Sequence, residues 1–283
     1  MRGVGMRTSR VMAAVALVVT VGSAAACSAP GGDRTAAPPA NGTTDGGAAA
    51  TSTPAGTVTP PAATATGTAS GSLPARLPGS AGGPLPLWPF HTLAEARAWQ
   101  QDYRSGGHQP WHTSAEQTAL SFVSGFLGFT GIDRVARREI GDTEAWITVG
   151  VRVPSGKISG AAAVHLVRFG AGRDAPWEVV GTRDTDLTLT SPAYGATVTT
   201  PLRAGGRITG VDESLRVQVR AEAGKAIGET CCQPAGGTAT PWSSDVDFGR
   251  PDSTVLTVVV STGGHVADVE RFAITGVRVG STG

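Results

Sequence analysis

A stretch of about 59 residues without one aromatic side chain, Ser28 to Pro86, limits what this chain can fold into. It consists almost entirely of Ala, Gly, Thr, Ser and Pro, with few charged residues. Such a composition cannot bury enough apolar surface to offset the entropy that ordering costs. We therefore expect a disordered linker over residues 27–86, spanning about 45 Å as a random coil. Folding is left to the part from Trp88 onward.

The first 26 residues have the layout of an export signal. Three arginines and no acid occur in the first ten residues, and an apolar or small-residue run follows from Val11 to Ala26. At 1.5 Å per residue this run covers about 24 Å as a helix, less than the ~30 Å core of a bilayer. The length favours a cleaved signal peptide over a membrane span.

The run ends in "AAAC", which resembles the lipobox of bacterial lipoproteins. The resemblance implies cleavage after residue 26, acyl chains such as palmitate on Cys27, and a place on the extracellular face of the cytoplasmic membrane. The family usually has Leu where Ala24 stands, and Ala24-x-Ala26 also suits ordinary signal peptidase, so plain secretion is one alternative and an uncleaved anchor is another. Lys157 and Lys225 are the only lysines, a bias that resembles proteins of GC-rich actinobacteria.

The charge balance gives no reason to expect nucleic acid as a partner. The formal net charge is +1, whereas binding to phosphate backbones or to anionic membrane surfaces needs clustered positive charge. The partners that we expect are the membrane, through lipid on Cys27, and an envelope protein or wall polymer.

The first of two predicted domains, residues 87–184, opens with two helices. The spacing T-x-x-E of a capping box occurs at Thr92 and again at Thr113, and paired glycines at Gly106 end the first helix. On the second helix one face is apolar at helical spacing: Ala119, Phe122, Val123, Phe126 and Leu127.

Strands are predicted after these helices in "EAWITVGVRV", "AAVHLVRF" and "PWEVVGTRD". The first has a single apolar face: Ala145, Ile147, Val149, Val151 and Val153. Helices followed by antiparallel strands indicate an α+β domain, and the order resembles the cone-shaped fold of nuclear-transport-factor-like proteins. That resemblance implies a pocket between helix and sheet, although the same side chains suit a filled core. The candidate lining residues are Trp99, Phe122, Phe126 and Trp146.

The sequence offers no arrangement typical of an active site. His108 and His112 are four apart, but Pro110 between them prevents the helix that would align two metal ligands. His91 precedes the predicted helix cap, and His165 alternates with apolar residues in a strand. There is no nucleophile elbow, no Gly-rich phosphate loop and no metal motif. We expect no cofactor, no metal and no enzymatic activity.

The second predicted domain, residues 185–283, reads as short strands separated by turns. "SLRVQVRAEAG" alternates most clearly, and "STVLTVVVS" and "RFAITGVRV" follow as late strands. About 95 residues with turns at intervals of roughly 8 to 12 predict an all-β sandwich.

The segment "LTLTSPAYGATVTTPLRAGGRITGVDESLRVQVR" resembles the immunoglobulin-like domain of bacterial spore germination proteins. The matching positions extend into the later "PW" segment: Pro192, Gly195, Pro201, Gly210, Glu213, Trp242 and Phe248. The resemblance covers about a third of the chain and implies an immunoglobulin-like, non-enzymatic surface module. The α/β domain that often accompanies it in that family is not evident upstream, so a germination role does not follow directly.

Cys231 and Cys232 are adjacent in "GETCCQPAGG" and, once Cys27 carries lipid, are the remaining thiols. An oxidising compartment favours a bond between them. Adjacent Cα atoms lie about 3.8 Å apart, below the usual disulfide range of about 4.4–6.8 Å, so the bridge is strained and reducible. The surrounding Gly and Pro predict a loop. We favour a vicinal disulfide, with free or intermolecular thiols and a metal or redox site as alternatives.

These observations predict a lipid-anchored envelope lipoprotein that acts as a binding or scaffold module, with a link to sporulation or germination suggested by the resemblance. The competing interpretation is a ligand-binding or enzymatic α+β domain with the sandwich as an accessory. The two differ in whether titratable groups converge in a concave site.

Overall fold

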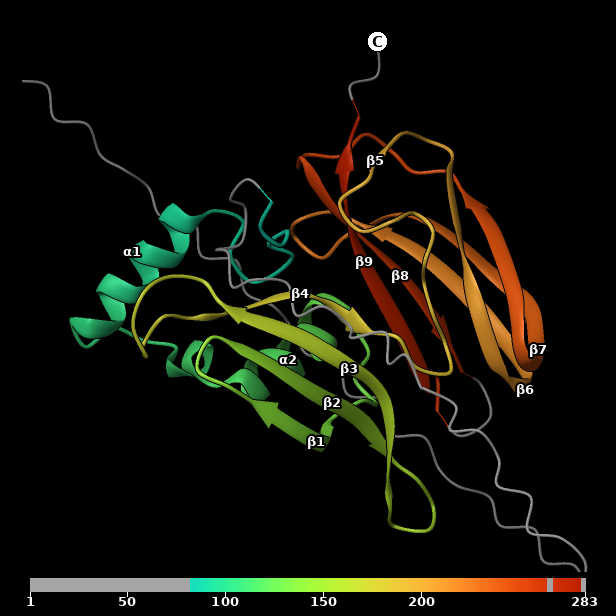
Figure 1. Ribbon diagram of the computed structural model, residues 1–283, viewed down its shortest axis with the longest axis horizontal. Helices are drawn as coiled ribbons and strands as arrows, with labels where there is room; N and C mark the ends of the chain where they lie inside the picture. The colour runs from blue at the N-terminus through green and yellow to red at the C-terminus, as the bar shows by residue number, and fades with distance from the viewer. Residues whose placement is uncertain (1–81, 264–266, 281–283) are drawn as a thin grey trace, which may run out of the picture. The chain divides into compact units, whose positions relative to one another are not determined.

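The computed structural model describes residues 82–263 and 267–280, which belong to one compact unit (Figure 1). Two sheets and a few short helices make up this part, and every helix in it precedes the first strand. A mostly β chain with its helices first is therefore confirmed. None of these helices is long and apolar enough to cross a bilayer. The predicted signal peptide, Cys27 and the linker up to residue 81 lie outside the described residues.

The first helix, α1 (Leu93–Arg104), begins and ends where the sequence predicts. The backbone N–H of Glu95 donates to Thr92 Oγ1 at 3.2 Å, which satisfies one of the free N–H groups at the helix start. After the C-cap at Ser105, Gly106 has a φ of 86°, a left-handed conformation that glycine adopts without strain.

The second helical region consists of a 3-10 turn, an α-helix and a π-turn: η1 (Pro110–Thr113), α2 (Ala115–Ser121) and η2 (Phe122–Phe126). The predicted cap at Thr113 is wrong by one residue. Thr113 still belongs to η1, and its hydroxyl donates to the carbonyl of Pro110, so Ser114 accepts from the backbone N–H of Gln117 instead. All five residues of the predicted apolar face are buried.

The first sheet is an antiparallel meander in the order β1-β2-β3-β4, made of β1 (Arg134–Ile140), β2 (Glu144–Arg152), β3 (Ile158–Arg168) and β4 (Trp177–Arg183). Helix α2 lies along one face of it (Figure 1). The predicted apolar face of β2 points towards this helix, with Ala145, Ile147 and Val149 fully buried. Strand β1 was not predicted because most of its side chains are charged, as is common in edge strands.

The second sheet has the order β5-β9-β8-β6-β7, made of β5 (Thr197–Val198), β6 (Leu202–Arg220), β7 (Ala226–Val246), β8 (Val255–Thr262) and β9 (Arg271–Val279). The long hairpin of β6 and β7 is drawn in orange in Figure 1. Residues 202–208 of β6 pair with β7 and lie beside residues 187–191, whereas residues 215–220 pair with both β7 and β8. The two halves of β6 thus have different neighbours.

The predicted boundary after Asp184 separates the two sheets but not two independent cores. Strand β8 is buried on both faces: Val258 and Val260 belong to a cluster formed within the second half of the chain, and Val259 belongs to the cluster under α2. Phe272 of β9 also belongs to the cluster under α2. Its ring meets that of Phe129 edge-on, with centroids 5.6 Å apart. The two predicted domains share part of their core.

The folded part also starts earlier than the predicted end of the linker at Pro86. Leu85 and Leu87 are buried in the core under α2. The backbone N–H of Leu87 donates to the carbonyl of Val179, and the Val179 N–H donates to the carbonyl of Trp88. These bonds hold the segment along β4, so apolar residues in a Pro- and Gly-rich context still become ordered here.

Candidate functional site

The face of the four-stranded sheet opposite α2 carries aromatic and charged side chains that contact one another. Because Ala145 points into the core, Trp146 projects from the opposite face. The strand register aligns Glu139, Trp146, His165 and Gly181 in one row across β1 to β4. We use the name Trp146 face for five residues of this surface: Glu139, Glu144, Trp146, His165 and Arg183.

Trp146 is held between charged and aromatic neighbours. Its ring stacks on the imidazole of His165, with centroids 3.9 Å apart and an interplanar angle of 7°. The guanidinium carbon of Arg183 lies 4.3 Å from the centroid of the Trp146 ring, within the range of a cation–π interaction. Arg183 also donates to both carboxylate oxygens of Glu139, at 3.2 and 3.3 Å. This two-point contact fixes the guanidinium over the indole.

The electrostatics of this surface favour a neutral imidazole beside a charged pair. Burial is the main cause that lowers the pKa of His165, and the positive charge of Arg183 adds to it, while Glu144, whose Oε1 lies 2.7 Å from His165 Nε2, opposes it. The hydrogen bond from Arg183 lowers the pKa of Glu139. At neutral pH the Trp146 face therefore carries two carboxylates and one guanidinium around a stacked aromatic pair.

A shallow hollow of about 470 Å³ lies beside Trp146 at the turn between β1 and β2. Residues 139–144 and Trp146 line it. Ile140, which pairs with Ala145 in the register, also lines the hollow and is 53% exposed. Tryptophan and arginine are enriched on protein surfaces that bind a partner.

The four residues predicted to line a helix–sheet pocket do not all come together at one place. Phe122 and Phe126 stack on each other at 5.1 Å within the core under α2, where both are buried. Trp99 lies in a separate cluster with Phe90, 6.1 Å between ring centroids. Trp146 is on the other face of the sheet. Core side chains thus occupy the place where the fold resemblance suggested a cavity.

His112 lies in the aromatic cluster at the start of the fold. Its ring centroid is 3.5 Å from that of Trp111, 5.0 Å from that of Trp99 and 5.1 Å from that of Phe90. Burial lowers the pKa of His112 to about 4, which keeps the imidazole neutral. His108 is exposed. Among residues 82–263 and 267–280, no three His, Cys, Asp or Glu side chains are grouped to bind a metal ion.

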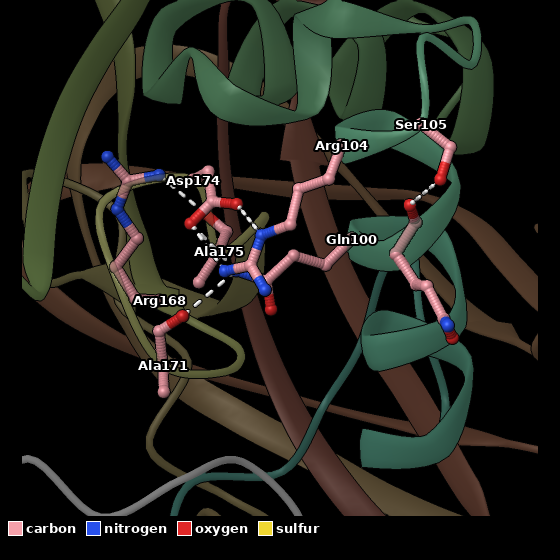
Figure 2. Close-up of polar contacts among 8 residues, drawn as sticks. Gln100, Arg104, Ser105, Arg168, Ala171, Asp174 and Ala175 are labelled. Carbon is pink, nitrogen blue, oxygen red and sulfur yellow. Dashed lines mark hydrogen bonds and ion pairs between the residues drawn. The ribbon is translucent and has the colours of Figure 1, made fainter.

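A polar cluster joins α1 to the connection between β3 and β4 (Figure 2). The side-chain amide of Gln100 donates to the carbonyl of Ala171 at 2.9 Å and to Asp174 Oδ1 at 3.0 Å. Arg104 donates to both oxygens of the same carboxylate, and its hydrogen bond is the main cause that lowers the pKa of Asp174 to about 2. Because these groups satisfy one another, we assign the cluster a structural role.

Cys231 and Cys232 lie in β7, so the predicted loop is wrong. Their sulfur atoms are 2.09 Å apart, at the distance of a disulfide bond. The pairing of β6 with β7 leaves both cysteines opposite the single residue Arg216, which makes a β-bulge in an edge strand. Cys232 has a φ of 72°. The Gly and Pro residues that suggested a loop are accommodated because β7 has neighbours on one side only.

Sequence reasoning missed two features. It treated His165 as an isolated strand residue and gave no role to Arg183, although both contact Trp146. It also missed Glu178, a fully buried carboxyl that accepts a hydrogen bond from the backbone N–H of Phe90. The available signal was a single acid inside the apolar strand "WEVV".

Comparisons with known protein families, with curated proteins and with solved structures find no match to this chain.

Proposed function

We propose that this protein is a lipid-anchored lipoprotein of the cell envelope that acts as a non-enzymatic binding module through the Trp146 face. The observation that carries the proposal is the fixed stack of Arg183, Trp146 and His165 beside the exposed Ile140. Tryptophan and arginine dominate the few residues that supply most of the energy in protein interfaces. Side chains already held in place lose little entropy when a partner binds.

Anchoring rests on the sequence of the N-terminus. Lipid on Cys27 would attach the chain to the membrane, and a coil of about 57 residues before Leu85 would let the folded part reach about 40 Å from that point. A binding surface on such a tether samples the space between membrane and wall. An envelope protein or a wall polymer is the partner that this location supplies.

We further propose an immunoglobulin-like sandwich for residues 185–283. Three features support it: residues 187–191 pair with the first half of β6, the second half of β6 pairs with β8, and β5 runs parallel to β9. This exchange of neighbours along one strand is how a chain passes between two stacked layers. The resemblance of residues 185–283 to spore germination proteins adds a germination-related role to the proposal. The order of helices and strands adds a nuclear-transport-factor-like fold for residues 87–184.

The test measures binding of the full-length lipoprotein, kept in detergent, to isolated wall particles by sedimentation. In cells, a photo-crosslinking amino acid at Ile140 reports contacts with envelope proteins. Trp146→Ala is expected to weaken either interaction by at least tenfold, because loss of a central aromatic residue typically costs about 2 kcal/mol or more.

The matched control is Val211→Ala, which truncates a side chain that is 78% exposed but lies in β6, away from the Trp146 face. It is expected to bind as the wild type does, and a crosslinker at Val211 is expected to capture nothing. Equal binding by Trp146→Ala and wild type would show that the surface is wrong. Absence of both wall binding and crosslinks in the wild type would refute a binding function.

A further inference from the structure

A pocket of about 270 Å³ lies where four segments meet: the stretch before α1, the end of η2, the turn between β6 and β7, and the start of β8 with the residues just before it. Its buried floor is apolar apart from one hydroxyl and consists of Leu87, Phe126, Ala221 and Thr257. Its wall carries His91 and Glu222, and Asp252 lies exposed at the rim. None of the residues that line the pocket belongs to the Trp146 face.

The charged groups of this pocket are acidic. His91 Nδ1 lies 3.0 Å from Glu222 Oε1. Burial is the main cause that lowers the pKa of His91, against the opposing charges of Glu222 and Glu95, so the imidazole is neutral at neutral pH. The residues that line the pocket include no Lys or Arg. The pocket thus presents the carboxyl groups of Glu222 on its wall and Asp252 at its rim, and neither forms an ion pair with a Lys or Arg among the described residues.

The nearest arginine on the same strand is directed elsewhere. Arg220 donates to the carbonyl oxygens of Phe126 and Gly224, at 2.8 and 2.6 Å, and to the side-chain oxygen of Gln218. These bonds use its guanidinium to join β6 to η2 and to the hairpin turn. They leave Glu222 without an arginine partner in the part of the chain that the structure describes.

The floor contains a polar group that the protein does not use. Thr257 is only 3% exposed and lines the pocket, yet its hydroxyl makes no hydrogen bond to any described residue. Its oxygen does not belong to the fully buried unpaired polar atoms of the described residues, so it is open to the pocket. A hydroxyl in this position is available to a molecule that enters the pocket.

We propose that this pocket binds the ammonium group of a small amine, paired with Glu222, with the carbon chain of the amine lying on Leu87 and Phe126. The hydroxyl of Thr257 then serves a second polar atom of the ligand. A cavity of about 270 Å³ accepts an amine of roughly six heavy atoms but not a folded segment. The same ammonium chemistry is found in free amines and in a lysine side chain of a peptide.

The experiment follows backbone amide signals by NMR while the full-length protein is titrated with n-pentylamine. We expect saturable shifts at His91, Glu222 and Thr257. The probe 1-pentanol has the same chain without the charge, and we expect no saturable shift with it. Nα-acetyl-lysine methylamide separates the two sources: its binding would point to a peptide lysine, and binding of n-pentylamine alone would point to a free amine.

The variant Glu222→Gln preserves shape and removes the charge. We expect it to weaken n-pentylamine binding by about tenfold or more, because hydrogen bonds to charged groups are the strong ones. Asp245→Asn is the matched control on the exposed side of β7 and is expected to bind as the wild type does. The proposal is overturned by an absence of saturable shifts at these amides, by equal binding of 1-pentanol, or by an unchanged affinity in Glu222→Gln.

Discussion

Glu178 accepts a 3.0 Å hydrogen bond from the backbone N–H of Phe90, and this contact joins the start of β4 to the segment that precedes α1. The carboxyl is fully buried, and its Oε1 atom has no hydrogen-bond partner among the described residues. Burial raises the pKa of Glu178 well above its usual value, against the opposing effect of the backbone donors. A carboxyl in such surroundings is more stable protonated than ionised.

This raised pKa predicts that Glu178 lowers the stability of the protein as the pH rises. A folded-state pKa above the unfolded value of about 4.3 means that the folded protein binds more protons. The stabilising contribution of the protonated carboxyl is complete below that unfolded value and is lost as the pH rises through the folded pKa. Glu178→Gln keeps an oxygen for the Phe90 N–H but does not titrate. It should match the wild type near pH 4 and exceed its stability at pH 8.

Urea unfolding of the full chain at several pH values between 4 and 8 checks this prediction. The difference between Glu178→Gln and wild type should grow with pH, by at most about 1.4 kcal/mol per pH unit. Asp186→Asn, which alters an exposed carboxylate, should follow the wild type throughout. Parallel stability profiles for Glu178→Gln and wild type would contradict the argument.

Lipid on Cys27 predicts a clear effect of a single substitution. Cys27→Ser removes the thiol that would be acylated, so the protein should appear in the medium or remain unprocessed. Two or more acyl chains give stable anchoring, which the wild type should show as complete partition with membranes. Membrane fractionation and intact mass of the mature chain measure both outcomes. Normal processing and unchanged membrane partition of Cys27→Ser would show that this lipoprotein assignment is wrong.

The apolar periodicity of the sequence predicted those elements whose burial is one-sided. The stripe from Ala119 to Leu127 and the alternation from Ala145 to Val151 both lie in the core as expected. Periodicity reports which face of an element is buried. It therefore predicts helices and strands well where one face is exposed to solvent and the other is buried. It predicted the helices and most strands for this reason.

The same signal said less where burial is not one-sided. Strand β8 was predicted, but Val258 and Val259 face different clusters, and nothing local in "STVLTVVVS" indicates what covers each face. Strands β1 and β7 lie at the edges of their sheets and carry the charged residues, Gly and Pro that usually mark loops.

Only part of the candidate site could be predicted from the sequence. Trp146 could be named as an aromatic residue of interest, but its partners depend on register. Arg183 is 37 positions further along the chain and reaches the indole only because β4 lies beside β3 in this meander. The proposed amine-binding pocket is still harder to predict from the sequence, because Leu87, Glu222 and Thr257 meet only through tertiary packing.

The bulge at Cys231 and Cys232 allows the effect of the backbone to be separated from that of the bond. An intramolecular bridge would make the native chain about 2 Da lighter than its reduced form, with no thiol free to react. The closed loop is the shortest one that a chain can form, so its closure removes little entropy from the unfolded state. We therefore expect Cys231→Ser with Cys232→Ser to lower the melting temperature by only a few degrees. Two alkylatable thiols in protein purified from the envelope would contradict the bridge.

Cys232 should prefer glycine once the bond is gone, because its φ of 72° is set by the bulge. A non-glycine residue in this left-handed conformation costs roughly 1–2 kcal/mol, and glycine adopts it freely. In a Cys231→Ser background, Cys232→Gly should therefore be more stable than Cys232→Ser by about 1 kcal/mol in urea unfolding. Gln233 is the matched control: it follows in the same strand without a positive φ, so Gln233→Gly should be less stable than Gln233→Ser. If serine is preferred at both positions, the bulge depends on the disulfide and relaxes when the bond is absent.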